Sequence, residues 1–494
     1  GMATVTCGPG LTQIVTALPA AVRAHIPLII FAGESPLKAR WYNQAIEQKP
    51  FIEACGAEYR SLHETSTMLK SINQAFVDSQ AQKKPIVLGI PLDLQEQPWK
   101  ETPVYPSSKT ATVEYRNALG SQADALSDIA RKIRFSNKVV VMAGRGAVES
   151  GAGEICVKLA DQNNALLATT LPARGLFREH AFNIGIAGGF STDTARQCLQ
   201  QADCIVAVGT RLAQHNSDGG KLFSADNVIH IDIEPRKFSQ GREASNHQLE
   251  SDAALGVHAL IVEIDRQNSE SSDAPPDTRS TNERWRSDKL AQEISLCPAD
   301  STVFDRTDSF LDPRDVVSTL DSVLPEDWTM VNSSGHCSYF FAQMPKRPVE
   351  HFVTIREFGA IGNGIAFAIG AAVARPDKPV VLFDGDGSLL MHIQEMETIV
   401  RHNLNILICV LNDGAYGSEI HKLRAHGLSD KGAVFGRSDF SKIAQGFDAS
   451  GSVIEDLNDV DAALTRYKQQ YGACIWDFHV TDEVISPVIR RSHH

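Results

Sequence analysis

The chain has 494 residues, of which 43% are hydrophobic, and it carries a formal net charge of −13 at pH 7. This acidic balance argues against nucleic acid or an anionic membrane as a partner, and no uninterrupted apolar run is long enough to span a bilayer. The nine cysteines lack paired C-x-x-C spacing and are typical of reduced thiols. We therefore expect a soluble, cytoplasmic protein of about three domains.

The first region, residues 1–98, alternates apolar runs with turn residues. Its apolar runs predict strands at Thr4–Cys7, Pro27–Gly33 and Pro85–Leu92. A Gly-Pro-Gly turn at residues 8–10 precedes a helix that we expect to reach about Ala24. Residues 96–121 are rich in Pro, Ser and Thr, which predicts a linker.

The second region, residues 121–265, repeats the alternation of strands and helices. Strands are predicted at Val139–Ala143, Ala165–Thr170, Cys204–Val208 and Val228–Ile233, with a helix that ends near Asn163. The turn at residues 144–146 resembles a dinucleotide-binding turn, but a full G-x-G-x-x-G is missing, so this signal is weak. The polar residues 266–284 have the composition of an exposed linker.

The third region, residues 310–488, holds the most informative stretch. Strands are predicted at Trp328–Val331, Val380–Phe383 and Ile406–Leu411, and a small-residue helix at Ile365–Ala374. Leu389, Ile393, Met396 and Val400 fall at helical spacing between the last two strands. This strand–helix–strand unit predicts two parallel strands joined by a right-handed connection. The fold class is therefore α/β, with doubly wound and mostly parallel sheets.

Two acids follow the last two strands of this unit. Asp386 and Asp413 should lie together at the carboxyl ends of the strands, where open α/β sheets bind ligands. Two converging carboxylates need a cation or a shared proton, and Mg²⁺ suits them because it takes its other ligands from substrate phosphates. Gly385 and Gly387 allow a sharp turn, and Ser388 offers a hydroxyl and N–H groups to an anion. The unit therefore predicts a site for a Mg²⁺-bound diphosphate.

This stretch resembles the thiamine-diphosphate-dependent enzymes, whose motif is Gly-Asp-Gly, a helix and a strand, then Asn-Asn or Asn-Asp. The 27-residue step from Asp386 to Asp413 matches that motif, with Asn412 as its first Asn. The resemblance implies that Asp386, Asp413 and the carbonyl of Ala415 hold Mg²⁺. It also implies that Tyr416 and Gly417 border the cofactor.

Two further segments match parts of the family that contact the cofactor. Gly335 and His336 follow a predicted strand, as does the family's segment near the diphosphate. Ile361 matches the bulky residue that holds the two cofactor rings in a V, and the carbonyl of Gly359 would accept from the 4′-amino group. Alternatively, His336 is a satisfied surface or core residue, and the glycines only allow close helix packing.

The chain most resembles the acetolactate synthase and pyruvate oxidase branch, through AGRGAVESGAGE, VGTRLAQ and VIHIDIEP. The implied domains are a pyrimidine-binding domain at 1–98, a Rossmann-like middle domain at 121–265 and a diphosphate-binding domain at 310–488. Some members bind FAD in the middle domain. Here VGTRL continues with residues 213–216, AQHN, which departs from the flavin-binding pattern and leaves FAD an open alternative.

The front of the first domain, which carries the family's activating glutamate, has no counterpart here. Glu34 and Glu47 lie on the wrong side of the turn at residues 8–10 to replace it. We therefore expect these 494 residues alone to turn over a 2-oxo acid very slowly. A catalytically incompetent cofactor-binding subunit is the alternative from another functional class.

The resemblance implies decarboxylation of a 2-oxo acid, with carboligation of the product, by a homodimer or homotetramer. Glu419 and His421 lie on the helix expected beside the reacting carbon, as acid/base groups or as a solvated face. The acetolactate branch has a tryptophan on this helix, and none occurs here between Trp328 and Trp476. A simple decarboxylase or an FAD-containing oxidase therefore stays an alternative.

Overall fold

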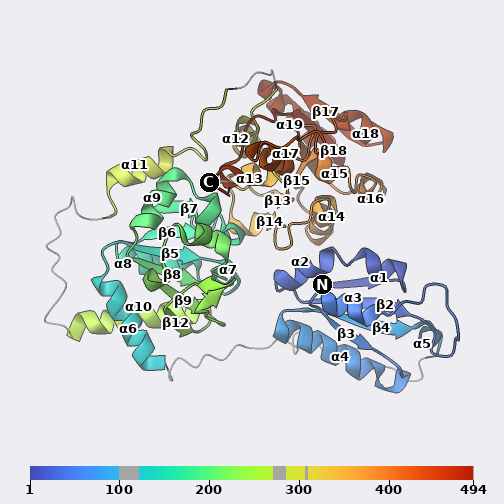
Figure 1. Ribbon diagram of the computed structural model, residues 1–494, viewed down its shortest axis with the longest axis horizontal. Helices are drawn as coiled ribbons and strands as arrows, with labels where there is room; N and C mark the ends of the chain where they lie inside the picture. Colours follow the sequence, from blue (N-terminus) through green and yellow to red (C-terminus); the bar gives the residue numbers. More distant parts are fainter. Residues whose placement is uncertain (99–121, 271–284, 306–309, 493–494) are drawn as a thin grey trace. The chain divides into compact units, whose positions relative to one another are not determined.

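The computed structural model describes residues 1–98, 122–270, 285–305 and 310–492 (Figure 1). Its contacts divide the chain into two units, Gly1–Tyr115 with Ile355–Ala360 and Arg116–Thr354 with Ile361–His494. Three parallel sheets of four, six and six strands confirm the predicted α/β class. The division into three domains stays a prediction. Most of the expected linker at 96–121 lies outside the described residues.

The first unit contains one parallel sheet with the strand order β1-β2-β4-β3. Its strands are β1 (Met2–Val5), β2 (Leu28–Glu34), β3 (Glu58–Ser61) and β4 (Pro85–Pro91). Its helices are α1 (Pro9–Gln13), α2 (Ala17–Arg23), α3 (Gln48–Ala54), α4 (Thr65–Gln82) and α5 (Leu92–Gln95). The single helix expected up to Ala24 is wrong, because it breaks at the β-branched residues Ile14, Val15 and Thr16, which restrict side-chain rotamers in a helix.

The second sheet has the order β12-β9-β8-β5-β6-β7. Its strands are β5 (Val139–Ala143), β6 (Leu166–Thr169), β7 (Asn183–Ile186), β8 (Cys204–Val208), β9 (Val228–Asp232) and β12 (His247–Glu250), and a short hairpin is formed by β10 (Phe238–Ser239) and β11 (Arg242–Glu243). The helices are α6 (Ala123–Phe135), α7 (Arg145–Glu149), α8 (Gly153–Gln162), α9 (Asp193–Gln201) and α10 (Ala253–Glu270).

The start of the expected linker at 266–284 is wrong, because α10 continues to Glu270. Arg266 forms ion pairs with Glu263 and Glu270 one helical turn away on either side. Arg134 of α6 donates to Asn268 at 2.7 Å, which ties the end of α10 to α6. Residues 271–284 lie outside the described part of the chain.

The third sheet has the order β14-β13-β15-β16-β18-β17 and is entirely parallel. Its strands are β13 (Thr329–Asn332), β14 (Phe352–Thr354), β15 (Val380–Gly385), β16 (Ile406–Asn412), β17 (Ser450–Ile454) and β18 (Ala473–His479). The helices of this part of the chain are α11 (Asp288–Leu296), α12 (Pro313–Val323), α13 (Cys337–Phe341), α14 (Gly364–Ala374), α15 (Asp386–Leu389), α16 (Glu395–Arg401), α17 (Gly417–Ala425), α18 (Phe440–Gly446), α19 (Val460–Gln469) and α20 (Pro487–Ser492). β16 is buried along its whole length, as expected for a central parallel strand covered on both faces.

The connection between β15 and β16 is two short helices, α15 and α16, so the single helix predicted from the spacing of residues 389–400 is wrong. The break contains His392, whose Nδ1 lies 3.0 Å from the carbonyl oxygen of Gly362. This bond to a distant turn draws the chain out of the helical path, while Met396 of α16 still packs in the core.

No helix in the described ranges is both long and apolar enough to cross a membrane. None of the nine cysteines, all of which lie in the described ranges, is joined in a disulfide.

Candidate functional site

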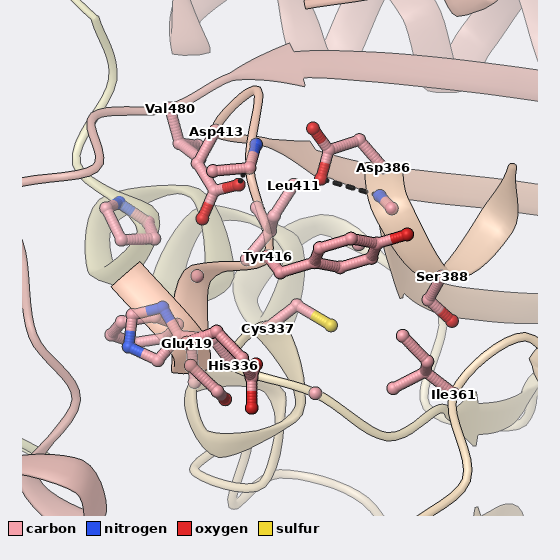
Figure 2. A pocket seen from close by; sticks show the side chains of 18 of the residues that line it. His336, Cys337, Ile361, Asp386, Ser388, Leu411, Asp413, Tyr416, Glu419 and Val480 are labelled. Carbon is pink, nitrogen blue, oxygen red and sulfur yellow. Dashed lines mark hydrogen bonds between the residues drawn. The ribbon is translucent and has the colours of Figure 1, made fainter. Parts of the chain in front are cut away.

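A pocket of about 540 Å³, its open mouth included, lies at the carboxyl ends of β15 and β16 (Figure 2). In the view of Figure 2, Asp386 and Asp413 lie at the top, Ser388 and Ile361 on the right, and His336 and Glu419 at the lower left. The predicted residues that line the pocket are Gly335, His336, Ile361, Gly385, Asp386, Gly387, Ser388, Asp413, Ala415, Tyr416, Gly417 and Glu419. Residues from four separated segments of the chain thus border one pocket.

Main-chain N–H groups orient the two carboxylates. Asp386 is buried, and its two oxygens accept hydrogen bonds from the N–H groups of Gly387 and Gly414, each at 2.8 Å. Asp413 accepts from the N–H of Ala415 at 3.1 Å. The bond from Gly414 ties the loop after β16 to the acid after β15. The strand–helix–strand unit therefore holds both acids on one side of the pocket.

Burial is the main reason why the pKa values of Asp386 and Asp413 are raised. It raises the pKa of Asp386 to about 7 and raises that of Asp413 well above its ordinary value, with the nearby Asp386 carboxylate adding to the second effect. The guanidinium of Arg437 opposes both shifts without cancelling them. A divalent cation between the two oxygens would remove this electrostatic cost.

The donor set fits Mg²⁺ better than a softer metal. Among the described residues, no group of three or more His, Cys, Asp or Glu side chains could hold a metal ion. The protein therefore offers two carboxylates and main-chain oxygen, and a bound ligand must supply the rest of the coordination shell. Mg²⁺ is held in this way, by one or two carboxylates and phosphate oxygens.

The glycines and Ser388 shape the turn after β15. A Cβ at Gly387 would lie 2.8 Å from the ring of Tyr416, so only glycine fits beside that ring. The Ser388 hydroxyl accepts from the N–H of Gly362 at 2.9 Å. This bond fixes the turn that presents Ile361 to the pocket.

Gly359 and His421 are the two predicted site residues that do not line this pocket. Gly359 lies in the turn before Ile361. Its φ of +75° is left-handed, as glycine allows, and its segment groups with the first unit. The role of the Gly359 carbonyl stays a prediction.

His336 and His421 form a buried aromatic pair. Their ring centroids lie 4.6 Å apart with an interplanar angle of 63°. Burial lowers the pKa of His336 well below its ordinary value and that of His421 to about 4, so both rings are neutral near pH 7. His421 is not part of the pocket lining and is not on a solvated face, because it is 3% exposed.

Glu419 lines the pocket beside His336, and its carboxylate accepts from Lys422 at 2.9 Å. Both partners of this ion pair are about half exposed. Exposed pairs contribute about 0–1 kcal/mol, so this pair leaves the carboxylate able to turn toward a ligand.

Asp384 directly precedes the Gly-Asp-Gly motif and was not predicted from the sequence. This carboxylate is fully buried, and its burial raises its pKa to about 7. Its Oδ1 accepts from the N–H of Gly385 at 2.9 Å. The sequence signal that could have identified Asp384 is its position as a second acid two residues before Asp386. The pocket is also lined by three residues from segments without a motif, which were not predicted: Pro313, Val480 and Thr481.

The glycine turn of the second sheet packs against the chain itself. A Cβ at Gly144 would lie 2.3 Å from the carbonyl oxygen of Gly209, and one at Gly146 would lie 2.9 Å from the Cα of the same residue. These contacts explain the glycines without a bound dinucleotide. The residues around this turn therefore give no support for a bound FAD.

Comparison with known proteins identifies the family. The family description "Thiamine pyrophosphate enzyme, C-terminal TPP binding domain" matches residues 333–478, and "Thiamine pyrophosphate enzyme, central domain" matches residues 126–260. The chain belongs to the thiamine pyrophosphate enzymes. The first match begins directly after β13 and includes both acids of the pocket, which confirms the predicted family and its enzymatic character.

Three similar relatives of this thiamine pyrophosphate enzyme are named as acetolactate synthases. A probable acetolactate synthase large subunit of Methanococcus aeolicus is 25% identical over 486 residues, covering 94% of this chain and 79% of the relative. The acetolactate synthase large subunit of Parasynechococcus marenigrum is 25% identical and covers 96% and 76%. Acetolactate synthase 2 of Zea mays is 25% identical and covers 99% and 77%.

Proposed function

We propose that this protein is a thiamine-diphosphate- and Mg²⁺-dependent enzyme that decarboxylates a small 2-oxo acid and ligates the product to a second carbonyl compound. The observation that carries the proposal is the pair of acids, Asp386 and Asp413, held by main-chain N–H groups at adjacent strand ends. The names of the relatives support the acetolactate-synthase-like reaction.

The binding tasks divide among the pocket residues. Asp386, Asp413 and the carbonyl of Ala415 would hold Mg²⁺, and the diphosphate would complete its shell. Gly385, Gly387 and Ser388 give the diphosphate close access to the main chain at the start of α15. Ile361, fixed through the bond between Gly362 and Ser388, would support the two rings.

When bound, thiamine diphosphate supplies a carbon nucleophile for the keto group and an acceptor for the electron pair that carbon dioxide leaves behind. The protein must then exclude water and deliver protons. We assign proton transfer to the second carbonyl compound to Glu419. This residue is the acid in the pocket lining that does not belong to the metal pair. His421 contacts the ring of His336 behind the pocket and would position it.

Product analysis of the purified protein with pyruvate tests the reaction. We expect carbon dioxide and acetolactate to form only with thiamine diphosphate and Mg²⁺, and both to be lost in Asp413→Ala. The exposed Asp461→Ala is the matched control. Carbon dioxide without acetolactate would indicate a simple decarboxylase. Cofactor binding without any turnover would instead favour a cofactor-binding subunit.

A second test addresses Glu419. Loss of a general acid or base slows a reaction by about 10²–10⁴-fold, so Glu419→Gln should lower kcat by that factor without changing stabilisation by the cofactor. Lys422→Gln breaks the same ion pair but keeps the carboxylate, and should retain activity. Equal kcat values for Glu419→Gln and the parent would remove Glu419 from the mechanism.

We further propose that the protein is at least a homodimer. Helix α14 is apolar all round, yet Ala366, Gly370 and Val373 are exposed on one side. A helix of this composition is normally buried on every face. Light scattering that gives a monomer at micromolar concentration, with cofactor present, would contradict this proposal.

A further inference from the structure

His336 receives a hydrogen bond from a part of the chain far along the sequence. The backbone N–H of Ser486 donates to Nε2 of His336 at 3.1 Å, in a buried bond that spans 150 positions. Ser486 is fully buried. It directly precedes α20, whose Arg490 donates to the carbonyl of Ile485 at 3.2 Å and forms an ion pair with Asp300 at 3.0 Å. These contacts hold the Ser486 N–H in place.

The bond determines where the imidazole carries its proton. A backbone N–H is only a donor, so Nε2 must present its lone pair. A neutral imidazole has one N–H, which is then on Nδ1. The ring is neutral because it is buried among other rings, with Phe340 at 5.0 Å and His421 at 4.6 Å between centroids.

Nδ1 of His336 faces the space that Gly417 leaves open. A Cβ at Gly417 would lie 2.9 Å from this nitrogen and 2.5 Å from Oδ2 of Asp413. The nitrogen and the carboxylate therefore border the same gap in the pocket wall. An anionic oxygen that approaches the metal pair would meet an N–H on this side.

We propose that the Ser486 N–H fixes His336 as its Nδ1–H tautomer, so that His336 donates a hydrogen bond to an anionic oxygen in the pocket and does not accept a proton. Ser486 is the positioning residue and acts through its main chain. The inference rests on the proposed function for the identity of the anion, which is either the diphosphate of the cofactor or the carboxylate of the 2-oxo acid.

The tautomer can be measured directly in the 494-residue chain. Histidine-selective ¹⁵N labelling, with the His336 signals assigned by their loss in His336→Gln, should show a protonated Nδ1 and an unprotonated Nε2 without any ligand. A protonated Nε2 in the parent overturns the inference, whether or not the variants fold.

Two probes distinguish the sources of the oxygen. Inorganic pyrophosphate with Mg²⁺ should move the Nδ1 signal if the diphosphate is the acceptor. Oxamate, an unreactive analogue of pyruvate, should move it in the protein loaded with thiamine diphosphate and Mg²⁺ if the substrate carboxylate is the acceptor. An Nδ1 signal unmoved by both overturns the donor role. If a probe moves the Nδ1 signal but the protein shows no turnover of 2-oxo acids, only the proposed function is contradicted.

Variants at Ser486 test whether its N–H fixes the tautomer of His336. Ser486→Pro removes the N–H, which should make both tautomers visible and weaken binding of the responding probe about two- to tenfold, as expected when a hydrogen bond to a charged group is lost in part of the population. Ser486→Ala keeps the N–H and should match the parent. If Ser486→Pro folds and shows a single Nδ1–H tautomer, another group fixes the ring.

Discussion

Asp386 makes the protein without metal sensitive to pH. Burial raises its pKa from 3.8 to about 7, so the folded protein keeps a proton that the unfolded chain releases. The contribution of Asp386 to stability must therefore fall as pH rises between these two values and level off above pH 7. The fall approaches about 1.4 kcal/mol per pH unit and weakens near pH 7, so the interval from pH 5 to pH 7 costs the folded state about 2 kcal/mol.

The substitution Asp386→Asn removes this dependence, because an amide does not ionise. Its Nδ2 would also face the N–H of Gly414 or Gly387, which costs about 1–3 kcal/mol at every pH. That constant cost cancels when the same pair of proteins is compared at two pH values. We therefore expect the variant to gain about 2 kcal/mol relative to the parent between pH 5 and pH 7.

Urea unfolding with a chelator present, followed by the fluorescence of the buried Trp328 and Trp476, measures this difference. The exposed Asp461→Asn should show no relative change with pH and serves as the control. Adding thiamine diphosphate and Mg²⁺ should stabilise the parent more than the variant, because only the parent keeps both carboxylates for the cation. A parent whose stability relative to the variant is constant or rises from pH 5 to pH 7 would refute the reasoning.

Two further substitutions test the shape of the pocket. Gly387→Ala would place a methyl group 2.8 Å from the Tyr416 ring, which should lower the free energy of unfolding by about 1–3 kcal/mol and weaken diphosphate binding. The control Gly432→Ala, whose added Cβ would have nothing within 4 Å, should have neither effect. Equal melting temperatures of the two variants would contradict this prediction. Ser388→Ala leaves the N–H of Gly362 without its acceptor, which should lower the free energy of unfolding by about 1–3 kcal/mol and reduce the cofactor-induced shift in melting temperature. An unchanged shift would show that Ser388 does not order the turn.

Much of the second and third sheets follows from short apolar runs. The strands at Val139–Ala143 and Cys204–Val208 match their predicted bounds, and Val380–Phe383 and Ile406–Leu411 only extend by one or two residues. Strands covered on both faces leave a continuous apolar signal, which is why these predictions hold. Helix ends were less predictable. The breaks after Gln13 and Leu389 depend on a β-branched triplet and on the bond between His392 and Gly362.

The sequence by itself determined that Asp386 and Asp413 share one side of a pocket. Their spacing encodes a strand–helix–strand unit, and adjacent parallel strands end at the same edge of a sheet. Only the tertiary structure decided what surrounds them. The contact of His336 with His421 and its bond from Ser486 join residues 85 or more positions apart. Such contacts leave no periodic pattern in the chain, because they depend on how separate elements pack and not on the repeat of any one element.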